Sequence, residues 1–181
     1  SVGARVSLGF NVSDIVDKIN SLDLLIPGRM ELVAKNAEQY IYIDYAHTPD
    51  SYQQIFKNIK SINDGYQLVS LFGCGGNRDY KKRSKMGAIS EKYCDRIFIT
   101  SDNPRNESLD KIMSDILKGF KHNKHEVVKD RKDAIETAIK SMRKKSILVV
   151  LGKGREEYQE IDDEKFFFSD VDIIKNYMYA N

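Results

Sequence analysis

The sequence has few of the residues that define specialised protein classes. Its 181 residues include only two cysteines, Cys74 and Cys94, with no CxxC motif or histidine cluster nearby, which argues against a disulfide scaffold and a zinc site. No apolar run approaches the roughly 18 residues that a membrane-spanning helix needs. The opening SVGARVSLGF lacks the charged start and long apolar core of a signal peptide. These absences favour a protein of the reducing cytoplasm.

Neither sign of charge is in excess. Lys and Arg number 29 against 27 Asp and Glu, so the formal net charge is +2. Binding to nucleic acid or to an anionic membrane needs a concentrated basic field, so we expect neither partner. Nucleic-acid binding remains an alternative only through one local basic cluster, which we otherwise expect to flank a pocket or face solvent: Lys81, Lys82, Arg83 and Lys85.

From residue 40 onward, short apolar runs alternate with amphipathic stretches. Strands are expected at 40–45, 66–73, 95–100, 125–128, 146–152 and 166–168. Helices are expected at 48–62, 82–93, 108–120, 130–144 and after Ser169. This alternation predicts an α/β fold, with a Rossmann-like, mostly parallel sheet flanked by helices. Thr48 is the expected cap of the first of these helices, with Pro49 at its first position and Ile55, Ile59 and Ile62 facing inward.

The first 27 residues differ from the rest. The stretch NVSDIVDKINSLDLL predicts an amphipathic helix capped by Asn11 or Ser13, and a Pro-Gly hinge follows it. A helix with no strand to pack on is typical of the end of a preceding domain. We therefore divide the chain into residues 1–27 and a domain at 28–181.

Polar loops follow four of the expected strands: DYAHTPD, GCGGNRDYKKR, SDNPR and GKGREEYQ. In an open parallel sheet, ligands bind beyond the carboxyl ends of the strands, so these loops predict one site. Taken singly, each could be a helix cap or a tight turn. The segment GKG at 152–154 lacks the spacer and the Ser or Thr of a Walker A phosphate loop.

Together with PGRME and the Asp-Arg pair at 130–131, these loops closely resemble the Mur ligases, in particular the MurE branch, which adds the third amino acid of the peptidoglycan stem. The resemblance implies that residues 28–181 form the C-terminal, amino-acid-binding domain and that 1–27 end the central domain. It also implies ATP and Mg²⁺ as cofactors and an acyl-phosphate intermediate. In that family the phosphate loop and the Mg²⁺ ligands belong to the central domain, so no metal site is expected here.

The resemblance also implies partners and residue roles. The partners would be UDP-MurNAc-L-Ala-D-Glu, meso-diaminopimelate, and the N-terminal and central domains of the same protein. Arg29 would lie near the nucleotide phosphates and, with Asp44, Tyr45 and His47, form the ATP-facing edge. Arg29, Asp44 and His47 are the candidate catalytic residues. His47 could act as a general base or simply hydrogen-bond the nucleotide.

The remaining candidates would bind the incoming amino acid. Diaminopimelate ends in a zwitterion, so its pocket needs cations for a carboxylate and acceptors for an ammonium group. Arg105 offers a planar fork whose direction Pro104 fixes. The full candidate set is Arg78, Asp102, Asn103, Arg105, Gly152 and Glu156. Two arginines would repel the side chain of lysine, which favours the diaminopimelate-adding branch.

Two positions depart from the family pattern. Arg155 stands where His is usual, and Asn77 stands where Asp is common. Arg155 adds charge beside Glu156 and could change how the distal end of the amino acid is recognised. Addition of lanthionine or lysine, and a non-catalytic module that binds an amino acid, therefore remain alternatives.

Overall fold

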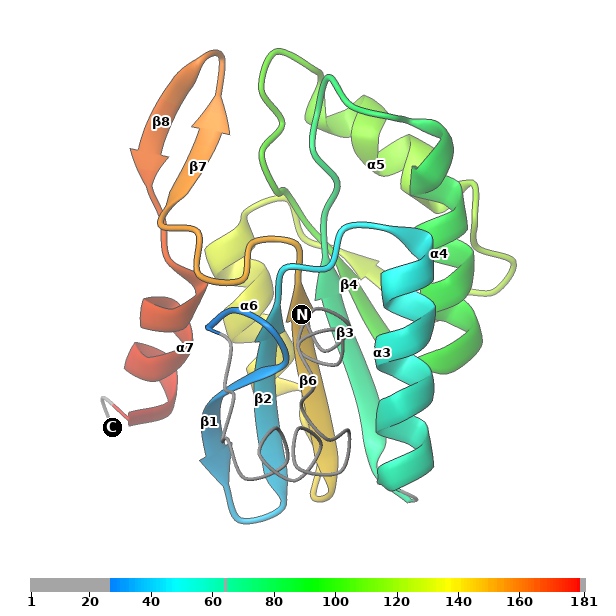
Figure 1. Cartoon of the computed structure of the whole chain (residues 1–181), viewed down its shortest axis with the longest axis vertical. Coiled ribbons are helices and arrows are strands. Elements are labelled where there is room, and N and C mark those ends of the chain that lie inside the picture. Colours follow the sequence, from blue (N-terminus) through cyan, green and yellow to red (C-terminus); the bar gives the residue numbers. More distant parts are fainter. Residues whose placement is uncertain (1–26, 64, 180–181) are drawn as a thin grey trace, which may run out of the picture.

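The computed structural model describes residues 27–63 and 65–179, which form a sheet with helices on both faces (Figure 1). The six strands lie in the order β1-β2-β6-β3-β4-β5. All neighbours pair in parallel except β1, which runs antiparallel to β2. The strands are β1 (Glu31–Asn36), β2 (Gln39–Asp44), β3 (Gln67–Phe72), β4 (Arg96–Ile99), β5 (His125–Val127) and β6 (Ser146–Leu151). The predicted α/β fold is confirmed.

Two groups of helices cover the sheet. The helices α3 (Pro49–Ile62), α4 (Lys81–Tyr93) and α5 (Leu109–Leu117) pack on one face, and α6 (Arg131–Lys140) and α7 (Asp170–Tyr179) on the other (Figure 1). Every residue of β6 is buried, as its unbroken apolar sequence predicts. Among the described residues, no helix is long and apolar enough to cross a membrane.

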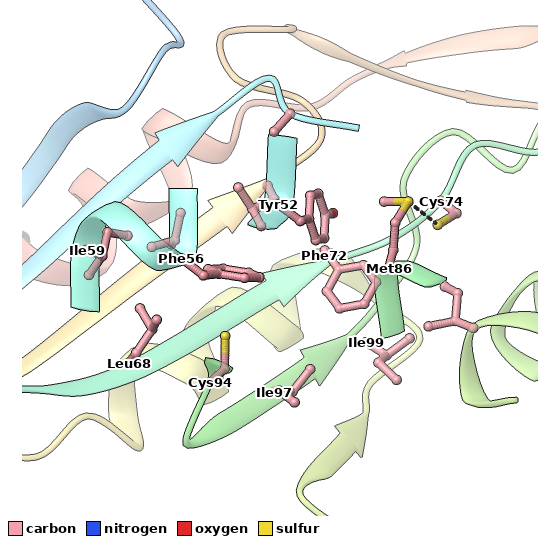
Figure 2. Packing of buried hydrophobic residues seen from close by; sticks show 14 of the residues in the cluster. Tyr52, Phe56, Ile59, Leu68, Phe72, Cys74, Met86, Cys94, Ile97 and Ile99 are labelled. Carbon is pink, nitrogen blue, oxygen red and sulfur yellow. Dashed lines mark hydrogen bonds between the residues drawn. The ribbon is translucent and has the colours of Figure 1, made fainter. Parts of the chain in front are cut away.

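Aromatic side chains fill the core beneath α3 (Figure 2). The Tyr52 ring packs edge-on against Phe56 and Phe72, with centroids 5.7 and 5.3 Å apart. The predicted inward stripe is wrong at Ile62, which is 79% exposed. The helical period places Tyr52, Phe56 and Ile59 on one face, and Ile62 lies in the final turn beyond it.

The predicted cap of α3 is confirmed, and α6 and α7 are capped in the same way. Thr48 accepts a hydrogen bond from the Ser51 amide, and Asp130 accepts one from the Asp133 amide. Ser169 likewise accepts from the Asp172 amide. Each cap satisfies an amide in the first turn of its helix.

Two strands were not predicted. β1 has no strong alternation of apolar residues, and it pairs at the edge of the sheet. β7 (Tyr158–Ile161) forms a separate antiparallel hairpin with β8 (Glu164–Phe167), which extends the strand expected near Phe166. The helix predicted before the Pro-Gly hinge, with Asn11 or Ser13 as its cap, lies outside the described residues.

Candidate functional site

A cavity of about 490 Å³ lies at the carboxyl ends of the parallel strands. Four loops line it: those after β2, β3, β4 and β6. Of the ten predicted site residues, eight line this one cavity: Tyr45, His47, Arg78, Asp102, Asn103, Arg105, Gly152 and Glu156. Arg29 and Asp44 do not. Cys74 and Met86 contribute to the cavity lining, with their sulfur atoms 3.9 Å apart (Figure 2).

Two glycines let the loops approach one another. A Cβ atom on Gly76 would lie 1.8 Å from the Pro104 carbonyl oxygen, and one on Gly152 would lie 2.4 Å from Asp102 Oδ2. The Gly76 amide donates to the Asn103 carbonyl at 2.9 Å. A side chain at position 76 would push the two loops apart, because it would meet backbone, whereas one at position 152 would displace the Asp102 carboxylate.

The Arg105 guanidinium is fixed from two sides. Its Nη1 donates to the Gly76 carbonyl at 3.0 Å, and its Nε pairs with Glu160 Oε2 at 3.0 Å. The Arg105 backbone is left-handed, with φ of 51°. Its amide donates to the Glu160 carbonyl, and its carbonyl accepts from the Asp162 amide. These bonds hold a conformation that non-glycine residues seldom adopt.

Lys153 is a site residue that the sequence reasoning missed. It is fully buried, and its Nζ donates to Asn103 Oδ1, Glu156 Oε2 and the Tyr158 carbonyl at 2.7–2.9 Å. Asn103 Nδ2 also donates to Glu156 Oε2 at 2.8 Å. Burial raises the pKa of Glu156, but the bonds from Lys153 and Asn103 outweigh it, and the pKa lies below its ordinary value. The sequence indicates this position only through the GKG segment, whose spacing does not fit a phosphate loop.

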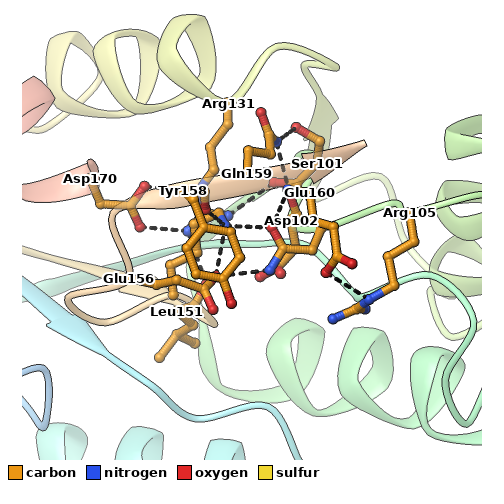
Figure 3. Close-up of polar contacts among 12 residues, drawn as sticks. Ser101, Asp102, Arg105, Arg131, Leu151, Glu156, Tyr158, Gln159, Glu160 and Asp170 are labelled. Carbon is orange, nitrogen blue, oxygen red and sulfur yellow. Dashed lines mark hydrogen bonds and ion pairs between the residues drawn. The ribbon is translucent and has the colours of Figure 1, made fainter. Parts of the chain in front are cut away.

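A second buried cation, Arg131, connects two helices to the carboxyl ends of the strands (Figure 3). Arg131 is fully buried and pairs with Asp170 through two bonds, at 2.7 and 2.8 Å. Two more of its donors bind the carbonyls of Ser101 and Leu151, at 3.1 and 3.2 Å. Arg131 thus ties α6 and α7 to the loop after β4 and to the end of β6.

Arg83 supports the glycine-rich loop in the same way. It is fully buried and donates to the Gly75 carbonyl, to Glu107 and to Asp115. Glu107 also accepts from the Asn77 amide at 3.0 Å. The bonds from Arg83 lower the pKa of Glu107 to about 2. Because Arg83 has no exposed surface, the cluster suggested for nucleic acid is not a continuous basic surface.

The part of the cavity wall formed by the loops after β2 and β3 is more exposed. Arg78 is exposed, and within residues 27–63 and 65–179 its side chain makes no hydrogen bond or ion pair. His47 is also exposed, and its Nδ1 lies 2.9 Å from the Tyr45 carbonyl. Since a carbonyl can only accept, Nδ1 must be the donor, which in the neutral ring leaves the lone pair on Nε2. Lys82 donates to the His47 carbonyl at 2.9 Å and lines the same wall.

Arg29 lies beside a smaller cavity of about 360 Å³, which Tyr45 also lines. The Arg29 guanidinium is 5.5 Å from the centre of the Tyr45 ring and 3.9 Å from Asp44 Oδ1. Asp44 itself is buried, and its two oxygens accept from the amides of Met30 and Ala46 at 2.7 and 2.6 Å. Asp44 therefore joins the backbone at Met30 to the backbone at Ala46.

Arg155 points away from the large cavity. Its Nε donates to Glu31 Oε2 at 2.8 Å, and its Nη2 donates to the other oxygen. Glu31 also accepts from the Gly28 amide. This hydrogen bonding lowers the pKa of Glu31. Arg155 therefore joins the loop after β6 to the first residue of β1, and it lines the smaller cavity beside Arg29 and not the large one.

The described part of the chain holds no group of three or more His, Cys, Asp or Glu side chains placed to bind a metal ion. Both cysteines are free and buried, and burial raises the pKa of each thiol to about 12. Neither thiol is activated as a nucleophile or a metal ligand.

Comparison with known proteins gives a consistent result. Residues 28–154 match the family model described as Mur ligase, glutamate ligase domain. A UDP-N-acetylmuramoyl-L-alanyl-D-glutamate–2,6-diaminopimelate ligase of Aquifex aeolicus is 44% identical over 83% of this chain and 31% of its own length. One of Clostridium acetobutylicum is 38% identical over 98% of this chain and 37% of its own length.

The structural comparison agrees. A solved ligase of the same description superposes with a TM-score of 0.79 and 34% identity, covering 99% of this chain and 37% of that chain. A Mycobacterium tuberculosis folylpolyglutamate synthase, 20% identical with a TM-score of 0.58, shares the fold over 72% of this chain and 30% of its own length. The chain spans about a third of the length of these relatives. It belongs to the Mur ligase family, through the glutamate ligase domain that residues 28–154 match.

Proposed function

We propose that this chain is the amino-acid-binding domain of an ATP-dependent ligase that joins meso-diaminopimelate to UDP-MurNAc-L-Ala-D-Glu. The main support is the single cavity that receives Arg78, Arg105, Asp102 and Glu156 from three different loops. The names of the relatives described above support the same substrate. Two free cysteines are compatible with work in the cytoplasm.

The cavity offers complementary groups for a zwitterionic tail. Arg105 and Arg78 would receive the distal carboxylate, for which a guanidinium fork is well shaped. Asp102, the second oxygen of Glu156 and the Gly152 carbonyl would accept from the distal ammonium group. A lysine side chain carries the ammonium group alone, so neither arginine would gain a carboxylate from the ligand.

The edge at Arg29 fits a nucleotide. The Arg29 side chain is 54% exposed, and it lies against Tyr45, whose ring is also exposed. An exposed guanidinium suits a phosphate, and the aromatic ring supplies a flat apolar surface beside it. ATP would supply the phosphoryl group that activates the substrate carboxylate. The described residues offer no ligand set for Mg²⁺.

His47 can assist the second half of the reaction. The amine must lose a proton when it attacks the activated carboxylate. His47 Nε2 carries a lone pair on the wall of the cavity, within the same loop as Tyr45. His47 is thus a base candidate, or a hydrogen-bonding partner of the nucleotide.

Calorimetry tests the proposal with meso-diaminopimelate, lysine and lanthionine. We expect diaminopimelate to bind about tenfold or more tightly than lysine, and Arg105→Ala to abolish that preference, because a charged hydrogen bond contributes about 1.5–3 kcal/mol. Lanthionine presents the same two terminal groups, so its rank decides between the two diacids. Equal binding of lysine and diaminopimelate by the wild type would overturn the proposal.

A second measurement separates the domain from the whole reaction. Because the sequence has no Walker A motif, we expect this chain alone to form no amide from ATP, diaminopimelate and the UDP-linked dipeptide. Amide formation by the pure chain would show that the phosphate-binding machinery lies within these 181 residues and would contradict the assignment.

A further inference from the structure

Glu160 occupies an unexpected position beside the Arg105 guanidinium. Its Oε2 lies 3.0 Å from Arg105 Nε (Figure 3). The Gly76 carbonyl accepts from Nη1 of the same guanidinium. Both side chains are mostly buried, at 20% and 22% exposure. An arginine has five N–H donors, so these two contacts fix the plane of the guanidinium and leave its remaining donors for a ligand.

The hairpin that carries Glu160 is attached to the SDNPR loop along its length. The Glu160 amide donates to Asn103 Oδ1, and its carbonyl accepts from the Arg105 amide. Gln159 donates to the Ser101 hydroxyl and to the Asp102 carbonyl, both at 2.8 Å. β7 therefore holds this loop through hydrogen bonds from both its backbone and its side chains.

Another cation lies close enough to compete for Glu160. Lys165 is directly opposite Glu160 in the register of the hairpin. Its Nζ instead lies 4.2 Å from the centre of the Tyr158 ring. Glu160 thus pairs with the arginine in the cavity and not with its cross-strand neighbour.

Building on the function proposed above, we propose that Glu160 is a positioning residue that orients the Arg105 fork and so sets the preference for amino acids with a distal carboxylate. It would not touch the ligand. Its oxygen fixes one edge of the guanidinium, so that the free edge faces the cavity before the ligand arrives. Pre-orientation reduces the side-chain entropy lost on binding.

The contact is an ion pair, so the charge of Glu160 carries this role together with its oxygen. Glutamine keeps an oxygen at the same distance from the backbone but loses the charge, whereas alanine removes both. We expect Glu160→Gln to weaken the affinity for meso-diaminopimelate about threefold and Glu160→Ala to weaken it about tenfold. Lysine, which has no distal carboxylate, should bind both variants as it binds the wild type.

Nuclear magnetic resonance on the 181-residue chain with ¹⁵N-labelled arginine provides the test. Arg105→Lys identifies the Arg105 Nε–H signal. Its exchange with water should be slowest in the wild type, faster in Glu160→Gln and fastest in Glu160→Ala. Titration with meso-diaminopimelate and lysine, up to millimolar concentration, gives the affinities. Glu164→Ala, an exposed change on the same hairpin, is the matched control and should alter neither signal nor affinity.

The outcomes separate this proposal from the proposed function. An unchanged Arg105 signal and unchanged affinity in a folded Glu160→Ala variant would overturn the role of Glu160, while a diaminopimelate preference in the wild type would preserve the function. If the wild type shows no preference for diaminopimelate, the proposed function fails. The Arg105 signal then still decides whether Glu160 orients the guanidinium.

Discussion

The two arginines of the cavity are held in opposite ways. Arg105 is mostly buried, with its backbone and its guanidinium both bonded to neighbouring segments. Arg78 is exposed and makes no polar side-chain contact within the described residues. Both were predicted for the same task, yet one is oriented in advance and the other is free to move.

The difference extends to the two parts of the cavity wall: one formed by the loops after β4 and β6, the other by the loops after β2 and β3. Behind Arg105, in the first part, the polar side chains of Asn103, Lys153 and Glu156 bond to one another. In the second part, Arg78 and His47 occupy exposed loop positions. A rigid wall gives selectivity, because a ligand must match it, whereas a mobile cation adds attraction at the cost of its own ordering. We infer that discrimination between amino acids resides mainly in the wall behind Arg105.

The largest effect should come from removing the support of the rigid wall. Arg131→Met leaves Asp170 buried without its cation and leaves the Ser101 and Leu151 carbonyls without their donor. Breaking a buried pair typically lowers the free energy of unfolding by about 3–5 kcal/mol. Denaturant unfolding monitored by circular dichroism measures the change.

Arg96→Met is the matched control, since it breaks an exposed ion pair with Glu126 and should change stability by less than about 1 kcal/mol. Adding Asp170→Leu to Arg131→Met should recover part of the loss, because the isolated buried charge is removed as well. A loss from Arg131→Met no greater than that of the control would refute the supporting role.

The sequence predicted the site better than it predicted how the site is held. Strand ends meet at one edge of a parallel sheet, so four polar loops could be assigned to one cavity without coordinates. The bonds that fix those loops depend on side-chain direction. Lys153 follows a glycine in a loop, and Glu160 lies in an unpredicted strand. Neither position indicates which group its side chain reaches.

The same limit explains the errors. Ile62 continues a three-residue spacing, but each such step turns about 60° short of a full circle, so Ile62 lies at the flank of the face that buries Tyr52, Phe56 and Ile59. Arg155 is adjacent in sequence to Glu156, yet the two side chains point to different loops. Periodicity and adjacency describe the chain locally. The residues that Lys153 and Arg155 bind are 50 and 124 positions away in the sequence.

A smaller but more selective effect is expected from conservative changes at the two arginines themselves. Lysine keeps the positive charge but lacks the planar fork. Arg105→Lys should weaken binding of meso-diaminopimelate about tenfold, because an ammonium group cannot contact Gly76, Glu160 and a carboxylate together. Arg78→Lys should weaken it only about threefold, because one exposed cation replaces another. Calorimetry with lysine as the reference ligand measures both, and equal losses would show that the two walls do not differ.

The smallest effect is expected at Arg155, outside both walls. Arg155→His introduces the residue that is usual in the family, and we expect stability to change by no more than about 0.5 kcal/mol, since Arg155 is half exposed. Glu31 would raise the pKa of a histidine here. The stabilising ion pair would then be fully present below the unfolded histidine pKa of about 6.5 and would disappear as the pH rises through the folded value.

The variant should therefore lose slightly more stability at pH 8 than at pH 5.5, relative to the wild type, whose arginine stays charged throughout. Thermal unfolding at the two pH values measures this difference, and Glu31→Gln should remove it. Selectivity between diaminopimelate and lysine should not change, because residue 155 faces Glu31 and not the cavity. A shift in that selectivity would place residue 155 at the ligand after all and would extend the rigid wall to the Gly28 loop.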